Sequence, residues 1–155
     1  MRAPADCEVR SGTEREVTYA GLGVVQSRLQ QRSPPLDHAS ILLLDRDDEY
    51  VDVLKLVLRM EGARVHAVSA ATEAVREIGA QRPNVFICDP ALADLRIHVA
   101  LHVCAVPRLL RLAVWSDPST LSAAVLHQFD DFVRKPVDVQ ALVRRIRLWT
   151  DFAEL

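Results

Sequence analysis

The chain has 155 residues, half of them hydrophobic, and a formal net charge of -2 at pH 7. This length and composition predict one globular domain with an ordinary apolar core. The small net charge excludes a general attraction to nucleic acid or to an anionic membrane, so neither is expected as a partner. The first residues carry charges without an apolar stretch, and no apolar run approaches the ~20 residues that span a bilayer. We therefore expect a cytoplasmic protein.

Residues 1–39 differ in composition from the rest of the chain. They contain three glycines and the pair Pro34-Pro35. We interpret this stretch as a flexible N-terminal extension and linker, with a docking arm for a partner as the alternative. A helix over residues 18–31 would be weak, because Gly21 and Gly23 each destabilise it by about 1 kcal/mol relative to alanine. Residues 40–155 then form the folded domain.

From Ser40 onward the apolar pattern alternates between short continuous runs and runs at helical spacing. The continuous runs are typical of strands buried on both faces and lie at 41–45, 65–68, 85–88, 109–115 and 131–134. The helical spacing predicts helices over 49–61, 70–81, 121–127 and 137–152. Gly62 is expected to end the first of these helices. Ser119 is expected to cap the helix over 121–127, and Trp149 is expected to face inward from the helix over 137–152.

Residues 94–106 fit both a strand and a helix, and a helix is preferred because a strand would break the alternation. The predicted fold class is therefore α/β, with a doubly wound parallel sheet of five strands.

Four polar residues each follow directly after one of the apolar runs. They are Asp45, Asp89, Ser116 and Lys135. In an open α/β sheet the carboxyl ends of the strands form the crevice where ligands bind. Two carboxylates, a hydroxyl and an amine gathered there could bind and transfer a phosphoryl group.

Together with the segment Phe132-Val-Arg-Lys-Pro136, the order and spacing of these residues resemble the receiver domain of two-component response regulators. The intervals are 44 residues from Asp45 to Asp89, 27 to Ser116 and 19 to Lys135. The resemblance covers roughly residues 40–151. It implies a flavodoxin-like sheet of order 2-1-3-4-5.

The resemblance also implies a role for each residue of the set. Asp89 would accept a phosphoryl group from a histidine kinase, and Asp45 with Asp89 would hold Mg²⁺. Ser116 and Lys135 would contact the phosphoryl oxygens. Phe132 would be the aromatic switch residue, which turns inward when the hydroxyl residue moves. The bond from Lys135 to the following proline would be cis. Such a domain is a signalling module and not an enzyme.

One position departs from the family pattern. The residue after Asp45 is Arg46, where the family has a second carboxylate. Two carboxylates would then face two cations, and Arg46 could pair with Asp89 or Asp45 in the place of the metal. We expect Mg²⁺ binding to be weak for this reason. The interval between Ser116 and Lys135 is a few residues shorter than is typical of the family. We therefore expect the helix over 121–127, the fourth along the chain, to be short.

The function expected from this set is that of a single-domain, atypical receiver in a phosphorelay, acting through protein–protein interaction. One alternative is a pseudo-receiver that binds partners without phosphorylation. A less favoured one is a phosphohydrolase of the haloacid-dehalogenase type, with Asp45 as nucleophile and Asp47 as acid/base. That family needs an acidic pair after its lysine, whereas Asp130 and Asp131 precede Lys135.

Two further features bear on partners. The last predicted helix carries Arg144, Arg145 and Arg147. Such a basic face is solvated or meets an acidic partner, and a homodimer through this helix is a further option. His98 and His102 are four residues apart, but a metal site needs three or four ligands, so we interpret them as partly exposed helix residues.

Overall fold

The computed structural model describes residues 34–104, 108–117, 119 and 122–153. The predicted extension, including the weak helix over 18–31, lies almost wholly outside these residues. The compact unit begins at Pro34, a few residues before the expected boundary. The reason is that Leu36 and Ala39 are fully buried in the core.

The described residues form strands and helices in alternation. The strands are β1 (Ser40–Leu44), β2 (Arg64–Val68), β3 (Val85–Cys88), β4 (Leu110–Trp115) and β5 (Asp131–Arg134). The helices are α2 (Asp48–Met60), α3 (Ala71–Gln81), α4 (Leu95–Val103), α5 (Ala123–Leu126) and α6 (Val139–Ala153). All strand pairs are parallel, in the order β2-β1-β3-β4-β5. The predicted flavodoxin-like α/β fold is confirmed. Within the described residues, no helix has the length and apolarity to cross a bilayer.

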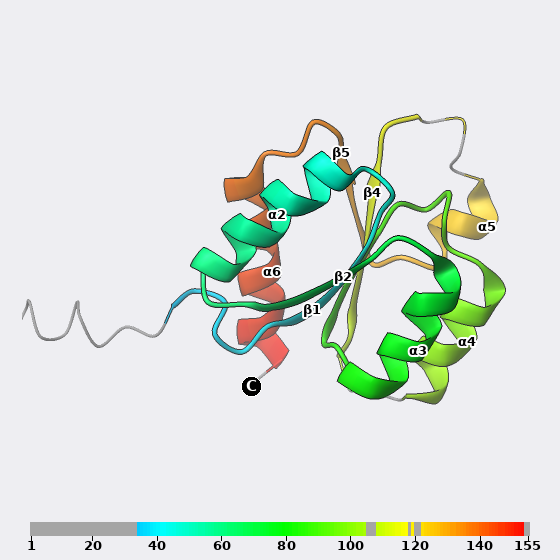
Figure 1. Cartoon of the computed structure of the whole chain (residues 1–155), viewed down its shortest axis with the longest axis horizontal. Coiled ribbons are helices and arrows are strands. Elements are labelled where there is room, and N and C mark those ends of the chain that lie inside the picture. The colour runs from blue at the N-terminus through cyan, green and yellow to red at the C-terminus, as the bar shows by residue number, and fades with distance from the viewer. Residues whose placement is uncertain (1–33, 105–107, 118, 120–121, 154–155) are drawn as a thin grey trace, which may run out of the picture. The chain divides into compact units, whose positions relative to one another are not determined.

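The helices cover both faces of the sheet (Figure 1), with α2 and α6 on one side and α3, α4 and α5 on the other. Alternate residues of the central strands supply the two cores, since neighbouring side chains of a strand point to opposite faces. Ile41 and Leu43 pack in the core beneath α2 and α6, and Leu42 and Leu44 in the core beneath α3 and α4. This burial on both faces explains the continuous apolar runs.

Helix α2 begins and ends where the sequence indicated. Asp47 caps its start by accepting a hydrogen bond from the Tyr50 amide at 3.1 Å. Asp48 and Glu49 in the first turn suit the positive end of the helix dipole. The helix ends before Gly62, whose φ of +98° is a left-handed conformation that glycine adopts without strain.

Helix α4 forms over the ambiguous segment, as preferred from the alternation. Its Ile97 and Leu101 are buried, whereas Leu95, Val99 and Val103 are exposed. Apolar residues on both sides of the helix blur the helical period, which is why the segment also read as a strand.

Two details differ from expectation. Helix α5 is only four residues long, as the short interval suggested, but Ser122 caps it and Ser119 does not. Ser119 instead donates its hydroxyl to Asp117 at 2.7 Å. Trp149 remains 37% exposed, because its indole N–H reaches the Arg108 carbonyl at the edge of the core.

Candidate functional site

Asp45 and Asp89 lie side by side at the carboxyl edge of the sheet. Leu44 and Cys88 are register partners in β1 and β3, and each is followed directly by one of the two aspartates. The Asp89 amide donates to the Leu44 carbonyl at 3.0 Å, which continues the ladder by one residue. Asp45 is only 4% exposed, and Asp89 is partly exposed. Parallel pairing of two neighbouring strands therefore brings both carboxylates to one place.

Lys135 reaches this place from β5. Its amide donates to the Trp115 carbonyl at 2.8 Å, and its ammonium Nζ lies 2.6 Å from Asp45 Oδ2. The following bond to Pro136 is cis, as the resemblance implied. A charge-assisted bond this short, between groups that are 17% and 4% exposed, is a strong interaction. The three strands thus assemble Asp45, Asp89 and Lys135 at one edge.

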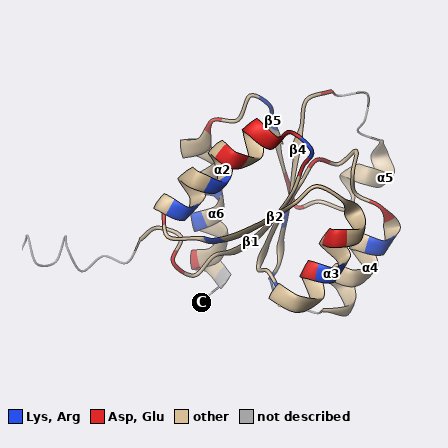
Figure 2. Cartoon of the chain, viewed as in Figure 1, with Lys and Arg blue, Asp and Glu red and all other residues tan. Residues whose placement is uncertain are grey.

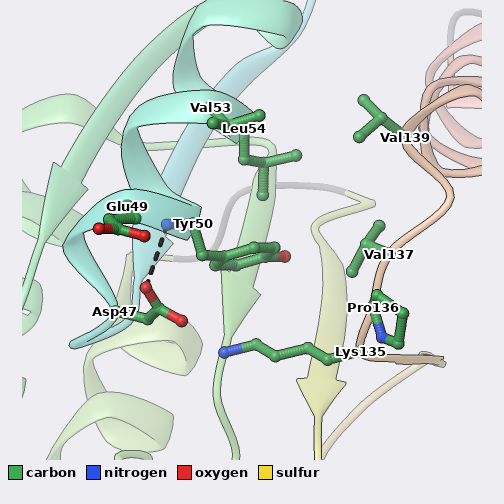
Figure 3. Close-up of a pocket in the computed structure, with 9 residues that line it drawn as sticks. All are labelled: Asp47, Glu49, Tyr50, Val53, Leu54, Lys135, Pro136, Val137 and Val139. Carbon is green, nitrogen blue, oxygen red and sulfur yellow. Dashed lines mark hydrogen bonds between the residues drawn. The ribbon is translucent and has the colours of Figure 1, made fainter.

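Tyr50 covers the lysine from the first turn of α2. The Lys135 ammonium lies 4.5 Å from the centroid of the Tyr50 ring, within the range of a cation–π contact. Figure 3 shows the lysine side chain running along the face of that ring. Burial, followed by the nearby carboxylates, raises the pKa of the Tyr50 phenol, so the phenol stays neutral. Tyr50 was not among the residues predicted from the sequence. Its position three residues after the cap of α2 was the available signal.

A cavity of about 610 Å³ lies between α2 and the segment that joins β5 to α6. Tyr50 and Lys135 line it together with mostly apolar neighbours, which Figure 3 labels. The lysine thus has the acidic edge of the sheet on one side and an open, largely apolar cavity on the other.

Asp89 has one carboxylate oxygen without a hydrogen-bond partner among the described residues. Its Oδ1 accepts the Ala91 amide at 2.9 Å, and its Oδ2 accepts no hydrogen bond from any described residue. The neighbouring Cys88 is fully buried, and its thiol donates to the Asp89 carbonyl. Burial, with a smaller contribution from Asp89, raises the pKa of that thiol, so it is an inert core group. The available group at this edge is therefore the Asp89 carboxylate.

Arg46 does not occupy the crevice in the structure. The side chain is exposed and forms no ion pair with any residue in the described ranges. The turn after β1 explains its direction: the Asp47 amide donates to Asp45 Oδ1 at 2.9 Å, and Asp47 then caps α2. The cation that contacts Asp45 is Lys135. Figure 2 shows the acidic start of α2 next to this turn.

The donor set does not fit a strong divalent cation site. Mg²⁺ prefers carboxylate and other oxygen ligands in near-octahedral geometry. One oxygen of Asp45 is bonded to Lys135 and the other to the Asp47 amide. Among the described residues no three or more His, Cys, Asp or Glu side chains are grouped so as to hold a metal. His98 and His102 accordingly belong to no such group.

Ser116 and Phe132 lie at the neighbouring strands of the same sheet. Ser116 directly follows β4 and is exposed. Phe132, in β5, is partly buried and packs with the core beneath α3 and α4. Its ring meets Phe129 with centroids 6.2 Å apart in an edge-to-face arrangement. Every predicted site residue from strands β1, β3, β4 and β5 therefore lies at or near one edge, with Arg46 turned outward.

A parallel sheet of this order, with polar residues at these strand ends, is the arrangement of response regulator receiver, or CheY-like, domains. The chain has this fold and is similar in sequence to distant members of that class. No family model matches the sequence.

The sequence relatives are distant. The chain is 26% identical over 118 residues to an uncharacterised 14.6 kDa protein of Leptolyngbya boryana, covering 72% of this chain and 90% of that protein. It is 26% identical over 113 residues to the DNA-binding response regulator MtrA of Mycobacterium tuberculosis, covering 69% of this chain and 48% of MtrA. It is 28% identical over 120 residues to the transcriptional regulatory protein YvrH of Bacillus subtilis, covering 72% and 49%. The chain thus spans about half the length of these two regulators.

Solved structures show the same fold. A putative response regulator from Chloroflexus aurantiacus is 28% identical with a TM-score of 0.59, covering 72% of this chain and 96% of that one. A CheY-like receiver domain from Methanospirillum hungatei is 24% identical with a TM-score of 0.63, covering 75% and 96%.

Proposed function

We propose that this domain is an atypical receiver of two-component signalling that accepts a phosphoryl group on Asp89 and acts through protein–protein interaction. The observation that carries the proposal is the carboxylate of Asp89. It stands at the carboxyl end of β3 with one oxygen unpartnered among the described residues, next to the pair formed by Asp45 and Lys135. In this role the domain is a signalling module and not an enzyme with a substrate of its own.

The chemistry of this step is a simple displacement. The free Oδ2 of Asp89 attacks the phosphorus of a phosphohistidine on a kinase or of a small phosphodonor. An O–P bond forms, and the P–N or P–O bond to the donor breaks. The electron pair goes to the leaving nitrogen, which takes up a proton from solvent, or to the carboxylate oxygen of acetate, which leaves as an anion. Because donor and acceptor are both anionic, positioning and fixed positive charge supply most of the help.

Lys135 is the source of fixed positive charge in this proposal. Its ammonium donates one hydrogen bond to Asp45, and its two other N–H groups could contact a phosphoryl group on Asp89. The hydroxyl of Ser116, exposed at the end of β4, would contact the same group from the neighbouring strand. Phe132 would then respond as the switch residue on β5.

Mg²⁺ has a weak role in the proposal. Asp45 and Asp89 are its two candidate ligands, and Asp45 is already bonded to a lysine and to a backbone amide. Arg46 adds a positive charge beside them where a third carboxylate would otherwise favour the ion. If Mg²⁺ binds, these two aspartates would hold it, and it would offset the charge of the incoming phosphoryl group.

The proposed partners are a histidine kinase or another signalling protein upstream, and a protein bound through α5, β5 and α6 downstream. On α6, Leu148 and Phe152 are 59% and 66% exposed, and Arg144 lies one turn before Leu148. Apolar residues beside arginine suit an acidic amphipathic partner. A homodimer through α6 is the second option for this surface.

The test is incubation with acetyl phosphate or phosphoramidate, with and without Mg²⁺, followed by intact-mass measurement. We expect one phosphoryl adduct on the wild-type chain and none on Asp89→Asn. Asp130→Asn is the matched control, since that aspartate is bonded to Arg111 away from the edge. An adduct that persists in Asp89→Asn would contradict the proposal.

The same experiment separates the alternatives. If wild type gives no adduct but Arg46→Asp does, the domain is a pseudo-receiver whose partners bind without phosphorylation. The bond between Lys135 and Asp45 supports this second candidate, because it already neutralises the edge. Labelling at Asp45 would indicate the phosphohydrolase chemistry, which the structure does not favour since the Asp47 carboxylate caps α2.

A further inference from the structure

We propose that His98 on α4 makes the position of the Phe132 ring depend on pH. The ring of Phe129 lies between the rings of these two residues and contacts both. The inference rests on the proposed function only in taking Phe132 as the switch residue. It adds a second influence on the position of the Phe132 ring, the protonation of His98 on α4, beside phosphorylation of Asp89.

The rings form a continuous row of edge-to-face contacts. The His98 and Phe129 rings have centroids 5.9 Å apart and an interplanar angle of 83°. The Phe129 and Phe132 rings follow at 6.2 Å and 67°. Phe129 is only 7% exposed, so it cannot shift without disturbing both neighbours. The row therefore links α4 to β5 by direct packing.

The imidazole is neutral in this arrangement. Its Nε2 is buried and has no hydrogen-bond partner among the described residues. A charged imidazole donates from both nitrogens, so protonation would leave a buried donor unsatisfied. Burial lowers the pKa of His98, and the charge of Arg111 lowers it further, while Asp94 acts in the opposite direction.

Arg111 and Asp94 are the charged groups that act on His98. The guanidinium of Arg111 has no acceptor atom, and the carboxylate of Asp94 is already hydrogen-bonded to other groups. Arg111, on β4, is held by both carboxylate oxygens of Asp130 at 3.0 and 3.1 Å. Asp94, at the start of α4, is engaged by Arg96 at 2.6 Å and by the Ile97 amide. Protonated His98 would thus find no carboxylate ready to pair with it.

Among the described residues, the other elements near α4 add no unoccupied acceptor for His98. Helix α5 carries no ionisable side chain. On α3, the carboxylate of Glu77 lies 3.4 Å from His66 and is also bonded to Gln81. Arg82, just after α3, donates to the Cys104 carbonyl at the far end of α4. A proton on His98 is therefore stable only where water reaches the ring.

A defined structural response follows. When His98 takes up a proton, its ring must turn toward solvent, and Phe129 loses the edge that packs against it. Phe129 then no longer fixes the ring of Phe132, which populates its outward position more often. Lower pH is therefore expected to oppose the inward position of Phe132.

The test is a pH titration of the full chain from pH 8 to pH 5 by NMR, observing the His98 imidazole and the ring signals of Phe132. We expect the His98 imidazole to titrate with a midpoint below the usual histidine pKa of about 6.5 and a Phe132 signal that moves with the same midpoint. His98→Leu should abolish that movement, and His98→Gln serves if the leucine variant does not fold. His102→Gln is the matched control, because His102 is an exposed histidine one turn along the same helix.

Two results would overturn the inference. One is a Phe132 signal that stays constant while His98 titrates. The other is the same pH dependence of Phe132 in His98→Leu as in wild type. No phosphodonor is used, so these outcomes are independent of whether Asp89 is phosphorylated, and a failure here is distinct from a failure of the proposed function.

Discussion

The Lys135 ammonium lies 2.6 Å from one carboxylate oxygen of Asp45, at the edge of the sheet where Asp89 also ends its strand. The pair joins residues 90 positions apart and connects β5 to β1 across the two strands between them. Because the Lys135 ammonium neutralises the Asp45 carboxylate, this ion pair sets the net negative charge at the carboxyl ends of the strands.

Removing the lysine should destabilise the domain. Lys135→Met leaves Asp45, which is 4% exposed, without its cation. We expect the free energy of unfolding to fall by about 2–3 kcal/mol, near the lower limit for a buried pair because Lys135 is partly exposed. Urea unfolding followed by circular dichroism measures this. Lys55→Met is the control: Lys55 lies 3.9 Å from the exposed Asp52, and its loss should change stability by less than about 0.5 kcal/mol. Equal effects of the two variants would contradict a special role of the Lys135 pair.

The hydroxyl of Tyr50 is expected to be dispensable for stability. It is buried and has no hydrogen-bond partner among the described residues, a situation that costs about 1–3 kcal/mol for a polar group. Tyr50→Phe keeps the ring over the lysine and removes the unsatisfied group, so stability should stay equal or rise by up to about 1 kcal/mol. Tyr50→Leu, which loses the ring, should be less stable than wild type. A loss of more than 1 kcal/mol in Tyr50→Phe would show that the hydroxyl has a partner in solution.

Gly62 is expected to tolerate no side chain. Its φ is +98°, and a Cβ there would lie 2.4 Å from the Pro34 Cβ and 3.3 Å from the Asp37 amide nitrogen. Gly62→Ala should lower the melting temperature, with a loss of about 1–2 kcal/mol or more from the left-handed backbone alone. Gly79→Ala provides the matched comparison. Gly79 lies within helix α3 with open space around its Cα, so alanine should stabilise the domain by about 0.5–1 kcal/mol. Opposite signs for the two variants are the predicted result.

His98 should make stability depend on pH near neutrality. Burial lowers the pKa of His98 in the folded chain below the usual histidine value of about 6.5, so the unfolded chain binds the proton more readily. Its contribution to stability is complete above pH 6.5 and is lost as the pH falls toward the folded pKa. Chemical unfolding at pH 7.5, 6.5 and 5.5 measures the change. The decline should be smaller in His98→Leu and unchanged in His102→Gln. An identical decline in all three chains would assign the pH dependence to other groups.

Most of the fold could be predicted from the sequence. Strands buried on both faces leave continuous apolar runs, and Gly62 marks the end of α2. What escaped prediction depends on three-dimensional detail. Ser119 and Ser122 are equally good caps by residue type, and contacts decide that Ser122 is used. Trp149 follows the helical period of the core, yet the Arg108 carbonyl keeps its ring at the surface.

The gathering of Asp45, Asp89 and Lys135 at one end of the sheet could be predicted, whereas the place of Tyr50 and the pairing of Lys135 with Asp45 could not. Spacing after the strands identified Asp45, Asp89 and Lys135, because strand ends are fixed by the sheet. The direction of a side chain in a turn is set by local hydrogen bonds that spacing does not reveal. The bond from the Asp47 amide to Asp45 turns the intervening Arg46 outward, and Lys135 contacts Asp45 instead.

We propose that the carboxyl ends of these strands carry too few carboxylates and too much positive charge to bind a divalent cation well. Mg²⁺ titration of wild type and Arg46→Asp by isothermal calorimetry is the decisive measurement. Because Arg46 lies on the exposed turn next to Asp45, this substitution changes the nearby charge by two units without adding a ligand that already points at the site. At on the order of 1 kcal/mol per unit charge for exposed groups, Mg²⁺ binding should tighten by about tenfold or more. Arg59→Asp, at the far end of α2, should leave the affinity unchanged. Wild-type Mg²⁺ affinity as high as that of Arg46→Asp would contradict the claim.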